Sequence, residues 1–414
     1  MRAPKQCVVL IGGLGTRLGT LTADTPKPLI DVGGRPFLEY LLGEAARFGF
    51  SEIVLLAGYR ADRVARYIEE SDIGRALNVS ITLRTEDRPA GTGGALWRAQ
   101  DLLDERFFLI NGDSWFDFNW LSLVLVDEPH SAIATMALRH LDNTGRYGVV
   151  GTDGHVVRRF LERPPTAGPG NINSGIYLLS RTVLDYLSAT CSLERDVFPI
   201  LAAKGILRAT VSTGRFIDIG VPADLARAQA ELPGWRRRPA VFLDRDGTLN
   251  EDEVGYTHRI EEFRWIPGAV EAVRYLNDAG FYVFVVTNQA GIARGMYDER
   301  QVVELHAWIQ NELRAQGAHI DDFRYCPFHP EGTVEAYRQV HPWRKPSPGM
   351  ILDLMKCWQV DVDRSALIGD SDSDVAAAVA SGVRGLKVGR TGLLAAVTGL
   401  GVEYSAPSLS GRFD

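Results

Sequence analysis

Apolar and polar positions along the chain follow two patterns, which predict short buried strands separated by amphipathic helices. Runs of consecutive apolar residues are typical of strands buried on both faces, and apolar residues spaced by about 3.6 positions are typical of helices that cover a sheet. In the first half these patterns predict strands at 7–12, 52–57, 79–83 and 107–111 and helices at 37–48, 61–70 and 92–103. Successive strand–helix–strand units predict a parallel sheet with helices on both faces.

The pattern loosens after residue 131 and begins again near residue 240. Short β-type runs with Gly and Pro turns follow residue 131, and a helix is expected at 222–232. Residues 233–239 (Pro-Gly-Trp-Arg-Arg-Arg-Pro) are basic, turn-rich and non-periodic, which is typical of a linker. Further strands are expected at 240–244, 281–287 and 366–370 and near 385–389. We therefore predict an α/β protein with two tandem domains, at 1–232 and 240–414.

Length and composition support this division. A chain of 414 residues exceeds the ~250–300 residues at which a single core stops growing. The formal net charge of −7 disfavours nucleic acid as the main partner. Four cysteines far apart in the sequence predict a reducing, cytoplasmic environment rather than a disulfide framework. No apolar run approaches the ~18–20 residues that cross a membrane, so no membrane span or signal peptide is expected.

A glycine-rich segment, Ile11-Gly-Gly-Leu-Gly-Thr-Arg-Leu18, follows the first expected strand. Glycines in this position let backbone N–H groups approach phosphate oxygens, and Arg17 and Lys27 are placed to neutralise a triphosphate. Taken alone, the segment also fits an ordinary strand-to-helix turn. A dinucleotide fingerprint is excluded because its third glycine is replaced by Leu18, and a P-loop is excluded because Gly-Lys-Ser/Thr is missing.

Two carboxylates stand at later strand ends of the same half. Asp113 closes Asn-Gly-Asp after one expected strand, and Asp218 lies just before the expected helix at 222–232. Because the carboxyl ends of parallel strands face one crevice, the two side chains are expected to hold Mg²⁺ on phosphate groups. The structural alternatives are a turn-forming role for Asp113 and a helix cap for Asp218.

Six motifs in this half occur in one order that resembles the sugar-1-phosphate nucleotidylyltransferase family. They are Gly12-Gly-Leu-Gly-Thr-Arg-Leu18 with Pro26-Lys-Pro-Leu29, Ala90-Gly-Thr-Gly-Gly-Ala-Leu96, Asn111-Gly-Asp113, Phe160-Leu-Glu-Arg-Pro164, Asn173-Ser-Gly-Ile-Tyr177 and Asp218-Ile-Gly220. The resemblance covers about residues 5–232 and implies a Rossmann-like nucleotidyltransferase sheet. It implies in-line attack by a sugar-1-phosphate oxygen on the α-phosphorus of an NTP, with pyrophosphate leaving.

The resemblance also implies a role for each matching residue. By this likeness the triphosphate is bound by Gly12, Gly13, Gly15, Thr16, Arg17 and Lys27, Mg²⁺ by Asp113 and Asp218, the base by the Gly91–Gly94 loop with Thr92, and the sugar phosphate by Glu162, Arg163 and Asn173. Arg17 and Lys27 would act catalytically by neutralising charge.

The base is expected to be guanine. Glu86 stands just before the base loop, and a carboxylate accepts two hydrogen bonds from the N1–H and N2–H₂ edge of guanine. The Gly-Thr-Gly-Gly-Ala sequence that begins at Gly91 is similar to that of heptose-1-phosphate guanylyltransferases. We therefore predict GTP as the nucleotide, with another NTP as the alternative.

The second half carries four polar clusters at expected strand ends or helix starts. They are Asp244-Arg-Asp-Gly-Thr-Leu-Asn250, Thr287-Asn-Gln289, Arg344-Lys-Pro346 and Gly369-Asp-Ser-Asp-Ser-Asp374. A lone Asp-x-Asp-Gly-Thr also fits a tight turn, but the four clusters converge on one crevice of a parallel sheet. Together they supply a carboxylate nucleophile, a second carboxyl group, a hydroxyl, a lysine and a further metal ligand.

These clusters resemble the haloacid dehalogenase phosphatase superfamily and, over 240–390, its heptose-bisphosphate and histidinol-phosphate phosphatase branch. The likeness implies a haloacid dehalogenase-like Rossmannoid domain in which Asp244 attacks phosphorus and Asp246 acts as general acid and base. The other implied roles are phosphoryl stabilisation by Thr287 and Lys345, Mg²⁺ binding by Asp244, the Asp246 carbonyl and Asp370, and contact with the rest of the substrate by Asn288, Arg294 and Arg344.

The chain departs from this branch at the structural zinc loop that many of its members carry. The loop reads Cys326-Pro-Phe-His329, and later cysteine positions hold His341 and Trp343. Thiolate and imidazole ligands are too few for a closed tetrahedral site, so we predict no zinc. A site built from Cys326, His329 and His341 is the alternative.

The pairing of the two chemistries narrows the function that the resemblances imply. A phosphatase fused to a sugar-1-phosphate transferase must spare the anomeric phosphate, as in removal of the 7-phosphate of D-glycero-D-manno-heptose 1,7-bisphosphate. We therefore expect a bifunctional enzyme of nucleotide-activated heptose synthesis that uses GTP, heptose 1-phosphate, heptose 1,7-bisphosphate and Mg²⁺ in both domains. The alternatives are a mannose or other hexose phosphate, or one domain that serves as a non-catalytic regulatory module; assembly into a homo-oligomer is left open.

Overall fold

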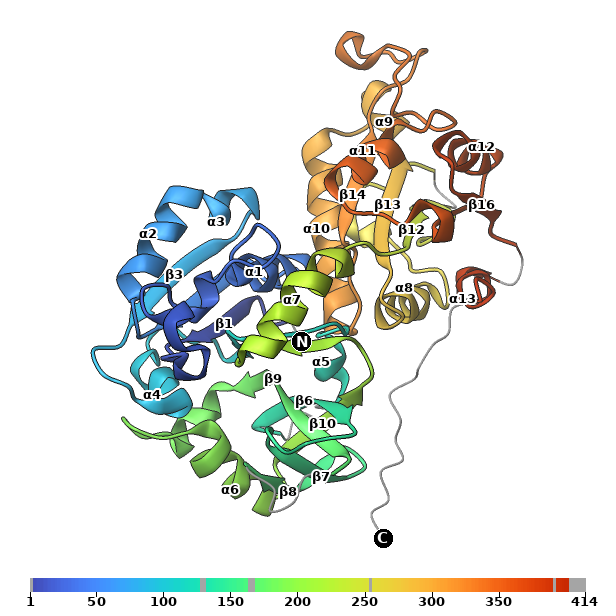
Figure 1. Ribbon diagram of the computed structural model, residues 1–414. Coiled ribbons are helices and arrows are strands. Elements are labelled where there is room, and N and C mark those ends of the chain that lie inside the picture. Colours follow the sequence, from blue (N-terminus) through green and yellow to red (C-terminus); the bar gives the residue numbers. More distant parts are fainter. Residues whose placement is uncertain (1–2, 127–131, 163–167, 253–254, 390–391, 402–414) are drawn as a thin grey trace. The chain divides into compact units, whose positions relative to one another are not determined.

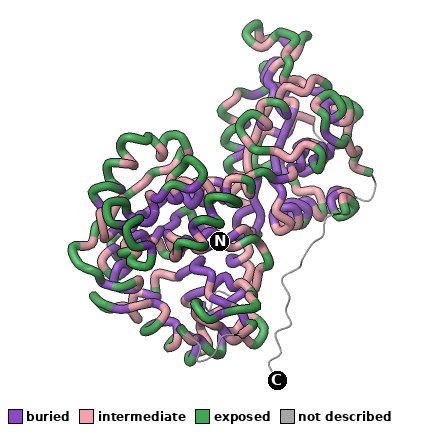
Figure 2. The backbone as a smooth tube through the Cα atoms, in the orientation of Figure 1, coloured by how far each residue is buried: buried purple, intermediate pink, exposed green. Residues whose placement is uncertain are grey.

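Each half of the chain folds around a β-sheet of its own. The computed structural model describes residues 3–126, 132–162, 168–252, 255–389 and 392–401. The chain divides into two compact units, Pro4–Gly234 and Trp235–Tyr404, called here the N-terminal and C-terminal units (Figure 1). Buried residues lie mainly along the strands of both sheets, and exposed residues lie mainly on the outer sides of the helices (Figure 2). The α/β fold predicted from the sequence is confirmed.

Among the described residues, the sheet of the N-terminal unit has nine strands in the order β3-β2-β1-β4-β9-β6-β10-β8-β7. Its strands, with the separate pair β5 and β11, are β1 (Gln6–Ile11), β2 (Glu52–Ala57), β3 (Ser80–Thr85), β4 (Arg106–Asn111), β5 (Ser114–Phe116), β6 (Ala134–Leu141), β7 (Val149–Asp153), β8 (Val156–Leu161), β9 (Gly170–Ser180), β10 (Leu207–Ser212) and β11 (Phe216–Asp218). β1 to β4 are mutually parallel, but β9 is antiparallel to both β4 and β6.

The parallel arrangement predicted for the strands up to residue 111 is confirmed, whereas the strands after residue 131, for which no direction was predicted, include antiparallel ones. The Gly-rich turns after residue 141 suit antiparallel neighbours, because antiparallel strands need only short connections whereas parallel strands need a crossover. The β7–β8 hairpin shows this directly, since it turns at Gly154, whose φ is +56°.

Seven α-helices accompany these strands in the described part of the unit. They are α1 (Phe37–Arg47), α2 (Ala61–Ser71), α3 (Ile73–Ala76), α4 (Gly91–Arg98), α5 (Ser122–Val126), α6 (Phe198–Ala203) and α7 (Pro222–Trp235). α4 ends at Arg98 rather than at residue 103 as expected. The buried amide of Gln6 binds the Leu102 carbonyl at 2.8 Å and the Asp104 N–H at 3.0 Å, and these bonds hold the following segment in a non-helical turn.

Helix α7 extends into the segment that was expected to be the linker. It continues through Pro233 to Trp235, so residues 233–235 are helical and the non-helical connection to β12 (Ala240–Leu243) is shorter than 233–239. Leu225, Ala228 and Leu232 are buried on one face of α7. The Pro233 ring lies against Gly33, where a Cβ atom would be 2.3 Å from Pro233 Cγ. This packing favours helix where composition alone indicated a turn.

The C-terminal unit has a five-stranded parallel sheet in the order β14-β13-β12-β15-β16. Its elements are β12 (Ala240–Leu243), α8 (Ala269–Asp278), β13 (Tyr282–Asn288), α9 (Ala290–Ala293), α10 (Glu299–Ala315), β14 (Asp322–Cys326), α11 (Gly349–Cys357), β15 (Ala366–Gly369), α12 (Asp372–Ser381), β16 (Arg384–Lys387) and α13 (Gly392–Thr398). The sequence did not predict β14, because this edge strand is half exposed and alternates polar with aromatic residues.

Two cores lie on opposite faces of this sheet, because successive side chains of a strand point to opposite faces. Val241 and Leu243 of β12 belong to one core, together with buried residues of α8, α10 and α13. Phe242, between them, belongs to the other core with residues of α11 and α12. Burial on both faces explains why this strand reads as a continuous apolar run. Among the described residues, no helix combines the length and apolar character needed to cross a bilayer.

Gly91 provides a test of how α4 is attached. Its φ is +79°, a Cβ atom there would lie 2.4 Å from the Cys191 carbonyl oxygen, and the N–H groups of Gly93 and Gly94 donate to the same oxygen. We expect Gly91→Ala to lower the free energy of unfolding by about 2–5 kcal/mol, from backbone strain and overpacking together. The matched control is Gly154→Ala, which has positive φ but no atom within 4 Å and should lose only about 1–2 kcal/mol. Equal losses in urea titrations of the two variants would contradict the role assigned to Cys191.

Candidate active sites

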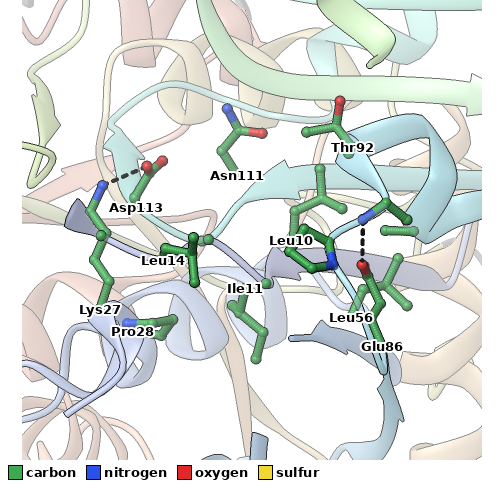
Figure 3. A pocket seen from close by; sticks show the side chains of 18 of the residues that line it. Leu10, Ile11, Leu14, Lys27, Pro28, Leu56, Glu86, Thr92, Asn111 and Asp113 are labelled. Atoms are coloured by element: carbon green, nitrogen blue, oxygen red, sulfur yellow. Dashed lines mark hydrogen bonds and ion pairs between the residues drawn. The ribbon is translucent and has the colours of Figure 1, made fainter. Parts of the chain in front are cut away.

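A pocket of about 440 Å³ opens at the carboxyl ends of β1 and β4 in the N-terminal unit (Figure 3). Its lining consists of Leu10, Ile11, Gly12, Gly13, Leu14, Gly15, Thr16, Lys27, Pro28, Leu56, Glu86, Pro89, Ala90, Gly91, Thr92, Ala95, Asn111, Gly112 and Asp113. Nine of these carry roles predicted from the sequence. Lys27 and Asp113 lie at one end of the pocket, and Glu86 and Thr92 lie at the other.

The glycines after β1 keep the floor of the pocket open. Gly12 lies against Gly58, where a Cβ atom would be 3.0 Å from the Gly12 carbonyl oxygen. Gly15 has φ of +63°, and a Cβ there would be 2.8 Å from Thr22 Cγ2. Gly13 is exposed and has no neighbour within 4 Å of an added Cβ, so its requirement is backbone access rather than packing. Arg17 is exposed and is not among the lining residues.

Lys27 joins the two predicted metal-binding carboxylates. Its buried ammonium lies 2.6 Å from Asp113 Oδ2 and 4.0 Å from Asp218 Oδ1. The short pair of β5 and β11 brings the carboxylates together, because Ser114 pairs with Asp218 and the Ile219 N–H donates to the Asp113 carbonyl at 2.9 Å. Burial, and then the charge of Asp113, raise the pKa of Asp218 to about 6. Two carboxylates that share one ammonium leave negative charge suited to a divalent cation.

Glu86 is half-buried at the opposite end of the pocket. One of its carboxylate oxygens accepts a hydrogen bond from the Ala90 N–H at 3.3 Å, which turns the side chain toward the start of α4 (Figure 3). Burial raises the pKa of this carboxyl group, and the Ala90 bond and the charge of Arg98 oppose the change.

The Thr92 hydroxyl forms hydrogen bonds with other residues of the N-terminal unit. Its hydroxyl donates to Glu194 Oε2 at 2.7 Å and accepts from the Leu193 N–H at 2.8 Å. The Gly91–Gly94 segment therefore forms the first turn of α4 and packs on residues 191–194, while Gly91 and Thr92 also line the pocket. No signal in the sequence pointed to Glu194, because this residue belongs to none of the six motifs.

Glu162 and Asn173, two of the residues expected to bind the sugar phosphate, do not line this pocket. Glu162 is exposed, and the Asn173 amide donates to the Tyr177 hydroxyl at 2.6 Å and accepts from the Gly175 N–H at 3.2 Å. Arg163 lies outside the described residues.

Asn111 is a pocket residue to which the sequence analysis gave no role. Its Oδ1 atom is buried and has no hydrogen-bond partner among the described residues, and its side chain faces the pocket between Asp113 and Thr92 (Figure 3). A Cβ atom at Gly175, whose φ is +81°, would lie 2.5 Å from Asn111 Nδ2. The available signal was the first position of the Asn-Gly-Asp motif.

The second site lies at the carboxyl ends of β12, β13 and β15 in the C-terminal unit. The Lys345 ammonium is 2.7 Å from Asp244 Oδ1 and 2.6 Å from Asp374 Oδ1. Carboxylate oxygens of Asp244, Asp370 and Asp374 all lie within 4.8 Å of one another. Asp374 was quoted in its motif but received no role. The available signal was its place in the same motif as Asp370, four residues further along and in the first turn of α12.

Crowding shifts the protonation of this site. Burial raises the pKa of Asp244 to about 6, opposed by Lys345 and supported by Asp374. Burial alone would lower the pKa of Lys345, but the two carboxylates outweigh it and raise that pKa. Burial and then Asp374 raise the pKa of Asp370. Three carboxylates around one lysine form an oxygen-rich group that fits Mg²⁺.

Hydrogen bonds at the end of β13 fix the positions of further residues whose roles were predicted from the sequence. Asn288 Nδ2 donates to the Lys345 carbonyl at 3.1 Å, and its Oδ1 accepts from the Lys345 N–H at 3.0 Å. Asn288 therefore holds the lysine-bearing segment on β13. The buried Thr287 hydroxyl accepts from Gln289 Nε2 at 2.9 Å, and the same amide nitrogen donates to Asp246.

Arg294 and Arg344 lie near each other beside Tyr256. Arg294 donates to the Tyr256 hydroxyl, and its guanidinium carbon is 5.4 Å from the centre of that ring. Arg344 is half-buried, and burial and then the charge of Arg294 lower its pKa. No acceptor among the described residues binds Arg344 Nη1. Tyr256 has φ of +63°, a strained conformation that is typical of functional segments.

Aromatic packing involves residues that were considered as zinc ligands from the sequence. The Phe328 and His341 rings stack with centroids 4.2 Å apart, and His341 Nδ1 accepts from the Trp343 N–H at 3.1 Å. Cys326 is buried with Sγ 3.9 Å from the Phe328 carbonyl, and His329 Nδ1 accepts from the Glu331 N–H. The absence of zinc stays a prediction.

The raised pKa of Asp244 predicts how stability depends on pH in metal-free protein. Between the usual value of 3.8 and about 6, the folded state binds more protons at Asp244 than the unfolded state does, so its contribution to stability falls as pH rises through this window. We expect Asp244→Asn to flatten the decline, measured by urea unfolding in chelator from pH 4 to pH 7. Asp372→Asn, a control at an exposed carboxylate paired with Lys387, should leave the decline in place. An unchanged slope in Asp244→Asn would contradict the assignment.

Comparison with known proteins identifies both units. Residues 6–233 match the nucleotidyl transferase family, and residues 342–396 match the HAD-hydrolase-like family. The D-glycero-beta-D-manno-heptose-1,7-bisphosphate 7-phosphatase of Rhodopseudomonas palustris is 56% identical over 151 residues, which cover 36% of this chain and 83% of that protein. The mannose-1-phosphate guanyltransferase beta-A of Xenopus laevis is 33% identical over 252 residues, which cover 58% of this chain and 69% of that protein.

A solved structure is similar to the first half. The crystal structure of HddC from Yersinia pseudotuberculosis is 31% identical, with a TM-score of 0.49, and the match covers 55% of this chain and 99% of HddC. The chain therefore belongs to the nucleotidyl transferase family over residues 6–233 and carries a HAD-type phosphatase after it, so it is an enzyme with two active sites.

Proposed function

We propose that the chain catalyses two successive steps in the synthesis of a nucleotide-activated heptose. The C-terminal unit hydrolyses the 7-phosphate of D-glycero-D-manno-heptose 1,7-bisphosphate, and the N-terminal unit transfers a guanylyl group from GTP to the resulting heptose 1-phosphate. The observation that carries this proposal is the presence in one chain of two lysine–carboxylate sites, one of which must spare the anomeric phosphate that the other uses. The relative from Rhodopseudomonas palustris, named for the first reaction, supports the choice of sugar.

In the phosphatase step, the proposed nucleophile is Asp244. Its carboxylate attacks the phosphorus, the bond from phosphorus to the sugar oxygen breaks, and the Asp246 carboxyl group gives its proton to the leaving alkoxide. Asp246 then takes a proton from the water that attacks the aspartyl-phosphate, which releases inorganic phosphate. Lys345 and the Thr287 hydroxyl stabilise the phosphoryl oxygens.

In the transferase step, an oxygen of heptose 1-phosphate attacks the α-phosphorus of GTP in line with the leaving pyrophosphate. We propose that backbone N–H groups at Gly12, Gly13, Gly15 and Thr16 bind the triphosphate, while Lys27 and Arg17 neutralise its charge. Glu162, Arg163 and Asn173 are proposed to contact the sugar phosphate.

Both sites fit Mg²⁺, because hard oxygen ligands surround each lysine. Asp113 and Asp218 would hold the ion in the N-terminal unit, and Asp244, Asp370 and the Asp246 carbonyl would hold it in the C-terminal unit, with Asp374 beside them. The ion supplies neutralisation of phosphate charge when bound.

The two arginines beside Tyr256 are proposed to bind the part of the bisphosphate that does not react. Two guanidinium groups near each other, with Arg344 Nη1 lacking an acceptor among the described residues, are suited to an anionic group such as the anomeric phosphate. Asn288 contributes by fixing the segment that carries Arg344 and Lys345. A reducing cytoplasm is the proposed location.

Separate loss of the two half-reactions tests the proposal. We expect Asp113→Asn to lower guanylyl transfer by at least ~10³-fold and leave phosphate release unchanged, and Asp244→Asn to do the reverse, because each site lies in its own unit. The assay follows pyrophosphate and inorganic phosphate from heptose 1,7-bisphosphate of each anomer with GTP. Asp372→Asn is the control that should retain both activities. Retention of both activities in the two site variants would support a non-catalytic role, and faster turnover of mannose 1-phosphate would assign another sugar.

Glu86 provides the test of the base. A half-buried carboxylate at the end of the pocket opposite Lys27 is proposed to accept the N1–H and N2–H₂ hydrogen bonds of guanine, and the relative from Xenopus laevis is named as a guanyltransferase. We expect Glu86→Gln to lower kcat/KM for GTP by about 10–100-fold, as for the loss of a charge-assisted pair of hydrogen bonds, while ATP changes by less than about threefold. A panel of four NTPs measures this. Faster turnover of ATP or CTP than GTP by the unaltered enzyme would contradict the role of Glu86.

A further inference from the structure

Arg245 lies between Asp244 and Asp246 in the sequence, and its side chain is completely buried. The proposed phosphatase mechanism gives it no role. Its Nε and Nη2 atoms donate to the two carboxylate oxygens of Asp246, at 3.1 and 2.9 Å. Nη2 also donates to the Thr257 carbonyl at 2.5 Å, and Nη1 lies 3.4 Å from His306 Nε2. The side chain has no measurable solvent exposure. A buried guanidinium with this set of acceptors has a single orientation, directed at Asp246.

His306 serves as an acceptor for this guanidinium. A guanidinium group only donates hydrogen bonds, so His306 Nε2 must accept, and the imidazole is neutral with its proton on Nδ1. Burial, and then the charge of Arg245, lower the pKa of His306 well below its usual value, in agreement with a neutral ring. The ring stacks on Phe323 with centroids 4.6 Å apart, which fixes its plane. His306 therefore orients Arg245 without adding a second positive charge.

Asp246 receives four hydrogen bonds, two on each oxygen. Besides the two from Arg245, Asn250 Nδ2 donates to Oδ1 at 3.0 Å and Gln289 Nε2 donates to Oδ2 at 2.9 Å. The Gln289 amide is itself fixed, because its Oε1 accepts from the Tyr297 hydroxyl at 2.7 Å. The carboxylate is thereby held in position beside the Asp244–Lys345 pair rather than free to rotate.

Two roles are open to a buried arginine of this kind. It can satisfy scaffold groups only, or it can hold a reacting group in place. Two of its hydrogen bonds form a bidentate pair with Asp246, which is the stronger and more directional arrangement, and one goes to the backbone at Thr257. We infer that Arg245 is a positioning residue of the phosphatase, which holds the Asp246 carboxyl group where it passes a proton to the leaving alkoxide and takes one from water. The inference rests on the proposed acid–base function of Asp246.

A double-mutant cycle in the full-length enzyme tests this role. We expect Arg245→Lys, which keeps the buried charge but loses the bidentate pair, to lower kcat for phosphate release by about 10–100-fold with KM changed less than about twofold. Adding Arg245→Lys to Asp246→Asn should lower activity no further, because Arg245 acts through Asp246. Single-turnover assays with enzyme in excess keep the slow variants measurable. The matched control is Arg324→Lys, since Arg324 also pairs with carboxylates, at Asp322 and Asp353, and should retain full kcat.

A second variant keeps the test decisive if Arg245→Lys does not fold. His306→Phe preserves a flat ring against Phe323 but removes the hydrogen-bond acceptor of Arg245 Nη1. We expect it to lower kcat by about 3–10-fold in the wild-type background and to cause no further loss in the Asp246→Asn background. Additive losses in the cycle would overturn the inference. A raised KM with unchanged kcat would also overturn it, by assigning Arg245 to the Thr257 segment instead.

The assay also separates this inference from the proposed substrate. Wild-type enzyme and variants are compared on heptose 1,7-bisphosphate and on p-nitrophenyl phosphate. Hydrolysis of only the aryl ester would remove the heptose proposal, and the cycle run with that ester would still decide the role of Arg245. Additive losses with either ester would remove the role of Arg245 and leave the phosphatase reaction standing.

Discussion

A single buried lysine holds negatively charged side chains together in each active site. Lys27 lies between Asp113 and Asp218, and Lys345 lies between Asp244 and Asp374. Carboxylates this close repel one another and lose hydration, as the raised pKa values of Asp218 and Asp244 show. The lysine offsets only part of that cost. Each site therefore retains an affinity for further positive charge. A divalent cation bound together with a phosphate ester matches the charge of the site better than either ligand would alone.

The sheets make this close grouping of charged side chains possible, because their strands bring residues from distant parts of the chain to one edge of the sheet. In the C-terminal unit, Asp244, Asp246 and Asp370 follow strands of the parallel sheet, Thr287 lies near the end of β13, and Lys345 belongs to the loop before α11. In the N-terminal unit the parallel half performs the same task for the glycine loop and Asp113, but Asp218 arrives through the antiparallel pair of β5 and β11. Two different sheet topologies thus fix carboxylates within a few ångströms of an ammonium group. Rigid placement of this kind is what phosphoryl and nucleotidyl transfer require.

The sequence was informative where residue type and spacing carry the chemistry. Motifs and their spacing indicated Lys27, Asp113, Asp244 and Lys345 before any geometry was known, and buried strands such as β12 were evident as apolar runs. Prediction was poorer where tertiary packing decides. The direction of β9, the helical state of Pro233 and the end of α4 depend on contacts between segments distant in sequence. Asp374 and Asn111 were visible in their motifs, yet only the fold shows that one joins the carboxylate group and the other faces the pocket.

The loop before Lys345 shows how packing can position a catalytic group. Tyr325 and Tyr337 both donate to the carboxylate of Glu299, at 2.7 and 2.6 Å, and the Phe328–His341 stack closes the same segment. Val334 N–H adds a bond to the Ala293 carbonyl. A ring stack is less directional than metal coordination, but it needs no deprotonated thiolate and is not removed by a chelator. Because Asn288 then clamps the Lys345 backbone on both its polar groups, the ammonium is positioned from two independent sides, by the aromatic loop and by the end of β13.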